Sequence, residues 1–120
     1  MPDRNLMVQA IEAYCRAEIE QDKATFFGLF AEDVVHEDPA NFVTRRGLEE
    51  LESLWAQVVA GNTNLWLTDD VIVNGHEAIA LMAAESGVGA ARRKISPIVD
   101  LFVFNEAGKI TNVRAFYKFN

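Results

Sequence analysis

The sequence predicts an α+β fold in a single domain, residues 1–120, with three helices in the first half packed on a cone-shaped, curved antiparallel sheet. Apolar residues recur at helical spacing through the first half, and apolar strand-like segments fill the second half. Helices followed by consecutive hairpins are typical of α+β folds. The length suits one domain, and half of the residues are apolar, which is enough for a core. We expect the space between the helices and the sheet to enclose an apolar cavity.

The first half carries three helix signals. Asp3 can cap a first helix that runs to about Glu20, and Asp22 can cap a short second helix that includes residues 26–30. A glycine opens a third helix over residues 47–60. The residues that we expect to face inward are Leu6, Met7, Ala10, Ile11, Tyr14, Cys15, Ile19, Leu48, Leu51, Leu54, Trp55, Val58 and Val59.

The second half carries the strand signals. The four strand candidates are residues 64–73, 77–85, 92–104 and 110–119. The sequence Asn-Glu-Ala-Gly between the last two is typical of a hairpin turn. A further short strand precedes Pro39, and we expect residues 40–46 to form a loop.

Charge and cysteine content exclude several classes of function. Lys and Arg number 11 and Asp and Glu number 18, and the resulting charge of −7 disfavours nucleic acid and anionic membranes as partners. The single cysteine, Cys15, allows no internal disulfide, and we expect it to pack in the core. No segment has the length of a membrane span, and the start lacks the apolar run of a signal peptide. We therefore expect a cytoplasmic protein.

Asp38 ends the first predicted strand, and strand alternation places it on the same side as His36. A carboxylate there can lie at the rim of a cavity. The alternative is that Asp38 only begins the turn at Pro39, where Asp is common. His36 either tunes the acidity of Asp38 or is an exposed strand residue, and we favour the second. We predict no metal site, because no cluster of three or four ligands exists.

Asp100 lies inside a strongly apolar strand. An isolated buried carboxylate is costly, so this group must pair with a cation, accept many hydrogen bonds or keep its proton. A salt bridge to Arg114 on the neighbouring strand is one solution. The other is a neutral carboxylic acid that donates a hydrogen bond. Tyr14, on the inner face of the first helix, can meet both acids in one pocket, although most buried tyrosines are core residues.

Three segments resemble the Δ5-3-ketosteroid isomerase (steroid delta-isomerase) family, within the wider nuclear-transport-factor-2-like and SnoaL-like superfamily. They are "IEAY" around Tyr14, "LFAEDVVHEDP" leading to Asp38, and "PIVDLFVFNEAGKITNVRAF" around Asp100. The resemblance covers most of residues 6–55 and 96–117 and is weak between them. The third segment is shifted by one residue from the family's pattern.

The resemblance implies a role for each of these three residues. Asp38 corresponds to the family's general base, and Tyr14 and Asp100 correspond to its two oxyanion-hole donors. The implied reaction moves the C=C bond of a β,γ-unsaturated ketosteroid or similar apolar enone into conjugation through a dienolate. It needs no metal or organic cofactor. The resemblance also implies a homodimer that pairs through the outer face of the sheet.

Two residues depart from the family's pattern. Trp55 stands where the family often has a tyrosine that supports the oxyanion-hole tyrosine, and an indole cannot accept a hydrogen bond. Phe30 likewise offers no hydroxyl, so we expect the acidity and position of Tyr14 to differ from the family's. The side chains that we expect to contact an apolar substrate are Phe30, Trp55, Met82, Phe102 and Phe116.

Two other functions stay open, because a fold does not determine a function. Another enzyme of this fold, such as a polyketide cyclase or an epoxide hydrolase, would hold a water molecule or a donor group with several polar cavity groups. The sequence shows few such groups beyond Tyr14, Asp38 and Asp100. A non-catalytic binder of small apolar ligands would keep the cavity but have no use for a buried acid.

Overall fold

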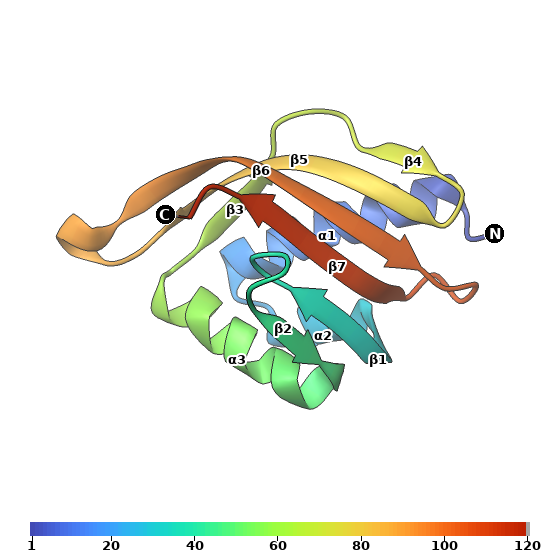
Figure 1. Ribbon diagram of the computed structural model, residues 1–120, viewed down its shortest axis with the longest axis horizontal. Coiled ribbons are helices and arrows are strands. Elements are labelled where there is room, and N and C mark those ends of the chain that lie inside the picture. The colour runs from blue at the N-terminus through green and yellow to red at the C-terminus, as the bar shows by residue number, and fades with distance from the viewer. Residues whose placement is uncertain (120) are drawn as a thin grey trace.

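The computed structural model describes residues 1–119 and confirms the α+β fold, with three α-helices on one side of a curved sheet (Figure 1). The helices are α1 (Arg4–Glu20), α2 (Lys23–Gly28) and α3 (Gly47–Ala60), and a short 3-10 helix, η1, spans Gly89–Ala91. The strands are β1 (Phe30–Glu37), β2 (Thr44–Arg46), β3 (Asn64–Leu67), β4 (Ile72–Asn74), β5 (Glu77–Ser86), β6 (Arg93–Phe104) and β7 (Ile110–Tyr117). Among the described residues, no helix is both long enough and apolar enough to cross a membrane.

The sheet has the strand order β2-β1-β7-β6-β5-β3, and β4 pairs with part of β5. Its pairs are antiparallel except for β1 with β7, which run parallel, so the sheet is mixed and not purely antiparallel as predicted. The β5–β6 hairpin extends beyond the helices at one end, while α1 passes behind the central strands (Figure 1). The β1–β7 pair brings the segment before Asp38 beside the end of the described chain.

Helix α1 begins as predicted, because the Asp3 carboxylate accepts hydrogen bonds from the backbone N–H groups of Asn5 and Leu6, at 2.7 and 3.2 Å. Its buried face is rotated slightly from the predicted one. Leu6 and Ile19 are exposed, and Glu18 is buried in the place expected for Ile19. Val59 of α3, which was also predicted to face inward, is exposed. The buried positions of α1 are Met7, Ile11, Tyr14, Cys15, Ala17 and Glu18.

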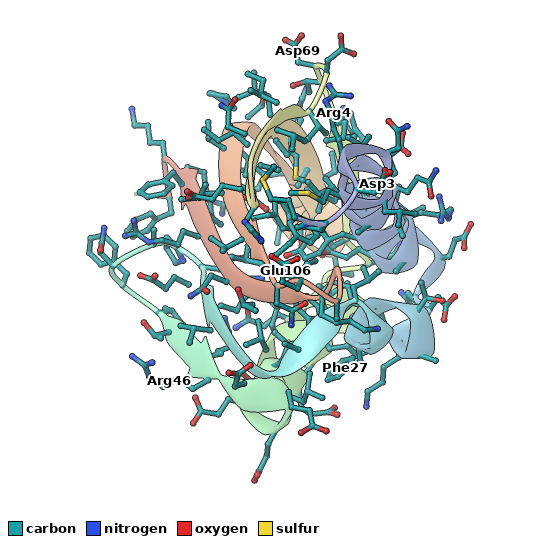
Figure 2. The ribbon with its side chains drawn as sticks, turned by 90° about the vertical axis from the view of Figure 1, so that its right-hand side faces the viewer. Asp3, Arg4, Phe27, Arg46, Asp69 and Glu106 are labelled. Carbon is teal, nitrogen blue, oxygen red and sulfur yellow. The ribbon has the colours of Figure 1, made fainter. Side chains whose placement is uncertain are left out.

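Three element boundaries differ from the prediction. Phe30 begins β1 instead of ending α2, and the predicted loop at 40–46 contains β2, which pairs with β1. The predicted strand at 64–73 is two strands, β3 and β4, separated by a charged turn. Figure 2 shows Asp69 of that turn pointing away from the fold. Exposed acidic residues favour such a turn over a continuous strand.

The core lies between the helices and the concave face of the sheet. Alternation along β6 directs Ile98, Asp100, Phe102 and Phe104 toward it. Each large apolar side chain buried here contributes roughly 1.5–3 kcal/mol to folding. An acid therefore lies in a row of otherwise apolar core residues.

Candidate active site

A cavity of about 210 Å³ opens between the helices and the sheet. It is lined by Tyr14 from α1, Asp38 from the end of β1, and Asp100 from β6, so the three predicted catalytic residues share one cavity. The other lining residues are Glu18, Leu54, Gln57, Val58, Thr63, Leu65, Ala84, Ser86, Ile95, Ile98, Ala115 and Tyr117.

Asp100 is 4% exposed, and its Oδ1 atom has no hydrogen-bond partner among residues 1–119. The possible salt bridge to Arg114 does not form. Arg114 lies opposite Leu101 on the other face of the sheet, and its Nε donates to Glu37 Oε2 at 2.9 Å. Burial, and then the charge of Asp38, raise the pKa of Asp100 well above its ordinary value, which favours the protonated acid.

Asp38 lies directly after β1, and its backbone N–H donates to the carbonyl oxygen of Val43 at 2.9 Å. Its carboxylate is not used by the following turn: Oδ1 accepts a hydrogen bond from the Tyr117 hydroxyl at 2.6 Å. Burial raises the pKa of Asp38, and this effect outweighs the Tyr117 hydrogen bond and the positive charge of Arg45, which both lower it. A carboxylate with a raised pKa is a stronger base once it is ionised.

Tyr14 is buried, and its ring packs edge-on against Phe102 at a centroid distance of 5.2 Å. Its hydroxyl is hydrogen-bonded to Nε2 of His36 at 2.9 Å. Burial is the first cause that raises the pKa of Tyr14 well above 10, followed by the charge of Glu18. The expectation that His36 is an exposed strand residue is wrong, because β1 turns this side chain into the core.

Glu18 is a cavity residue that sequence reasoning missed. It follows Tyr14 by one helical turn, is 6% exposed, and lines the same cavity. Burial, followed by the charges of Asp100 and Asp38, raises the pKa of Glu18 to about 8. The i, i+4 spacing from Tyr14 was the available signal, but a charged residue near a helix end is usually assigned to the solvent side.

The cavity is more polar than the sequence indicated. Besides Tyr14 and the acids, its lining includes Gln57, Thr63, Ser86 and Tyr117. The hydroxyl groups of Thr63 and Ser86 are hydrogen-bonded to each other at 2.9 Å. The expectation of few inward polar groups is therefore wrong, and a substrate with several oxygen atoms would find partners here.

The five predicted substrate-contact residues do not line this cavity. Phe30, Trp55, Met82 and Phe102 are buried behind it in the core, and Phe116 is 41% exposed on the outer face of the sheet. Alternation along β7 explains the last case, since the neighbours of Phe116 on either side face the cavity instead. The apolar lining comes from Leu54, Val58, Leu65, Ala84, Ile95, Ile98 and Ala115.

Within residues 1–119, no group of three or more His, Cys, Asp or Glu side chains is arranged to hold a metal ion. Cys15 is buried and unpaired, in the core position predicted for it. The titratable groups at the cavity are three carboxyl groups, two phenols and one imidazole behind Tyr14. Such a set can remove a proton at one atom and stabilise negative charge at another.

Comparison with known proteins shows the same architecture. One similar structure is SalBIII, an epoxide hydrolase/cyclase-like enzyme with a role in pyran ring formation in the polyether salinomycin. It is 23% identical, with a TM-score of 0.88, over 98% of this chain and 95% of that one. A Mycobacterium tuberculosis protein in complex with estradiol-17beta-hemisuccinate is 20% identical, with a TM-score of 0.84, over 94% of each chain. An epoxide hydrolase of the LEH-like type from M. tuberculosis is 18% identical, with a TM-score of 0.81, over 98% of this chain and 82% of that one.

At these identities the likeness shows the fold alone. The family model of the SnoaL-like domain, however, matches residues 11–113, which is most of the chain. This chain therefore belongs to the SnoaL-like domain family.

Proposed function

We propose that this chain is an acid–base enzyme that moves the C=C bond of a β,γ-unsaturated ketone, steroid-like or smaller, into conjugation. Asp38 removes the proton from the carbon between the carbonyl and the alkene. Tyr14 and the protonated Asp100 donate hydrogen bonds to the oxygen of the resulting dienolate. Asp38 then returns the proton two carbons further along, so that no redox partner is needed.

One observation carries this proposal: the buried acid Asp100, whose Oδ1 has no hydrogen-bond partner in the described part of the chain, faces the cavity that also holds Asp38 and Tyr14. A carboxylate is a weak base for a carbon acid, so the reaction requires strong stabilisation of the enolate oxygen. Two neutral donors in a dry site supply it, as in ketosteroid isomerases. The base must lose its proton near neutral pH, which agrees with the half-buried position of Asp38. The donor must keep its proton, which agrees with the full burial of Asp100.

The cavity also bears on the substrate. Its volume of about 210 Å³ lies below the range of about 300–1,000 Å³ typical of pockets that enclose drug-sized ligands. The substrate is therefore smaller than a steroid, or it extends through the cavity mouth. The structural neighbour in complex with estradiol-17beta-hemisuccinate supports the second option, an apolar polycyclic ligand that extends through the cavity mouth. A homodimer and a cytoplasmic location stay predictions.

A second reaction, opening of an epoxide by a hydroxyl group of the same substrate, is favoured by the polar cavity lining. Here Asp100 would give its proton to the epoxide oxygen as the C–O bond breaks. Asp38 would accept the proton of the attacking hydroxyl, and a ring would form. Gln57, Thr63 and Ser86 would hold the additional oxygen atoms of such a substrate. The fold neighbour with a role in pyran ring formation supports testing this reaction too.

The test mixes the purified protein with a Δ5-3-ketosteroid and follows the ultraviolet absorbance of the conjugated enone. Asp38→Asn should lose turnover, while the matched variant Asp33→Asn should keep it, because Asp33 lies on β1, just before Asp38 in the chain, but is exposed. An epoxy alcohol is tested in parallel by chromatography with mass spectrometry, where a hydrolysed diol gains the mass of one water and the cyclic ether, an isomer of the substrate, is identified by its retention time against an authentic standard. Turnover of the epoxide alone would replace the isomerase proposal with the second reaction. Turnover that survives in Asp38→Asn would show that Asp38 is not the general base.

Asp100→Leu separates an enzyme from a binder. Removing the unpaired buried oxygen should raise the free energy of unfolding by roughly 1–3 kcal/mol, measured by urea denaturation. An enzyme should also lose at least a hundredfold in kcat, because one oxyanion donor is gone. If stability rises while turnover and steroid binding are unchanged, Asp100 has no part in the reaction.

A further inference from the structure

The Tyr14 hydroxyl carries one proton, and its hydrogen bond to His36 Nε2 at 2.9 Å can run in either direction. If Nε2 accepts, the Tyr14 proton is engaged and cannot be donated to a substrate oxygen. If Nε2 carries a proton and donates, the Tyr14 proton is free to point into the cavity. The imidazole tautomer therefore decides whether Tyr14 can act as an oxyanion-hole donor.

His36 has one N–H group, because it is neutral. It is fully buried, and burial, with a further effect of the positive charge of Arg45, lowers the pKa of His36 to about 3. A neutral imidazole is a donor at one ring nitrogen and an acceptor at the other. The surroundings of Nδ1 thus determine what Nε2 can do.

A buried positive charge on β2, Arg45, acts on this imidazole. Arg45 on β2 lies directly opposite His36 on β1, so both side chains lie on the same face of the sheet. Arg45 is 7% exposed, whereas its neighbour Arg46 points away from the fold (Figure 2). The Arg45 guanidinium is held in place, since its Nε donates to Ser53 Oγ at 2.7 Å and that hydroxyl donates to the Glu50 carbonyl at 2.9 Å.

Two buried polar atoms in this region have no hydrogen-bond partner among residues 1–119: Nη1 of Arg45 and Nδ1 of His36. A guanidinium nitrogen can only donate. The two atoms are complementary only if Nδ1 carries a lone pair and no proton. A proton on Nδ1 would instead add a second buried donor without a partner, under the influence of the Arg45 charge, and orphaned buried N–H groups are rare.

We propose that Arg45 and His36 are positioning residues that keep the Tyr14 hydroxyl as a hydrogen-bond donor to the cavity. Arg45 keeps the proton off Nδ1, so the imidazole donates from Nε2 to the Tyr14 oxygen, and Tyr14 donates its own proton onward. The donation to a substrate oxygen rests on the proposed function. The tautomer and the direction of the His36–Tyr14 bond do not.

This arrangement takes the place of the supporting tyrosine that the resemblance associates with position 55. The Trp55 ring packs against Phe26 at a centroid distance of 5.0 Å, and the Tyr14 hydroxyl is hydrogen-bonded to His36 instead. The donor to the Tyr14 oxygen is here the His36 imidazole, whose second ring nitrogen can accept a hydrogen bond, as an indole cannot. The departure at Trp55 therefore does not leave Tyr14 without support.

Nitrogen-15 NMR of the histidine-labelled protein tests the tautomer without any substrate. The chain has two histidines, and the His76→Gln variant identifies the signals of His36. At pH 7 we expect one protonated nitrogen, Nε2, and one unprotonated nitrogen, Nδ1. A proton on Nδ1, or on both nitrogens, would overturn the proposal.

Matched variants then test the source of the tautomer. Arg45→Met should produce a population with the proton on Nδ1, while Arg46→Met should leave the spectrum unchanged. An unchanged spectrum in folded Arg45→Met would show that Arg45 does not determine the tautomer of His36. If Arg45→Met does not fold, the wild-type spectrum still decides the tautomer.

Kinetics complete the test on the ketosteroid reaction. His36→Leu should lower kcat by roughly ten- to a hundredfold with little change in KM, a loss no greater than that of one oxyanion donor. His36→Gln places an amide N–H near Nε2 and should recover most of the loss. Equal kcat in the Leu and Gln variants would contradict the donor role. An Nε2–H tautomer in a protein without turnover would support the proposed direction of the His36–Tyr14 hydrogen bond and reject the proposed function. The two proposals can therefore fail separately.

Discussion

Glu18 provides the sharpest stability prediction, because it is a buried carboxyl group on the cavity side of α1. We expect Glu18→Gln to stabilise the protein near neutral pH and to do so less in acid. The reason is that burial raises the pKa of Glu18 from 4.5 to about 8 in the folded state. As pH rises above 4.5, the unfolded chain loses this proton first, which favours unfolding.

The size follows from the two pKa values. A shift from 4.5 to about 8, at about 1.4 kcal/mol per unit, sets an upper limit of about 5 kcal/mol above pH 8. The same linkage gives a penalty of about 3 kcal/mol at pH 7 and about 1 kcal/mol at pH 5. The difference of about 2 kcal/mol between the two pH values does not depend on how well glutamine packs.

Urea denaturation of wild type and Glu18→Gln at pH 5, 6, 7 and 8 measures this difference. Glu12→Gln is the matched control, because it makes the same change on the exposed side of the same helix. Its effect on the free energy of unfolding should be small. A Glu18→Gln effect that stays constant between pH 5 and pH 7, or that shrinks as pH rises, would show that Glu18 ionises normally in the folded protein.

Two further predictions concern the base and a tight turn. Tyr117→Phe removes the hydrogen bond that lowers the pKa of Asp38, so the acid limb of the pH profile of kcat/KM should move to higher pH; an unmoved limb would mean that another group is titrating. Gly87→Ala should destabilise the protein by roughly 1–3 kcal/mol in urea, because φ is +113° and a Cβ would lie 2.5 Å from the Ala91 carbonyl oxygen. Gly28→Ala, where a Cβ meets no atom within 4 Å, is its control, and equal losses would contradict the reasoning.

The parts of the site that could be predicted were those with a local signal. An acid among apolar residues identified Asp100, because charge and strand alternation conflict within a few positions of the chain. The strand end before Pro39 identified Asp38, and helical spacing placed Tyr14 on the inner face. We also expected that Tyr14 can meet both acids in one pocket, and all three residues line the same cavity. Their catalytic roles stay predictions.

The parts that were missed depend on contacts between distant segments. Alternation put His36 on the side of Asp38, but its contact with Tyr14 joins β1 to α1, 22 residues away in sequence. Tyr117 reaches Asp38 only because β7 pairs with β1, a contact 79 residues apart in sequence. A single sequence contains no local mark of either contact. For this reason the hydrogen-bond partners of the site were harder to predict than its acids.

The pairing of β1 with β7 joins two strands that are synthesised at different times. At typical synthesis rates of about 5–20 residues per second, roughly 4–16 s separate the appearance of Asp38 from that of its partner Tyr117. During that time one edge of β1 has no neighbour, and an open strand edge invites association with other chains. The last strand of the described fold thus closes this edge and delivers a hydrogen bond to the proposed base in the same event.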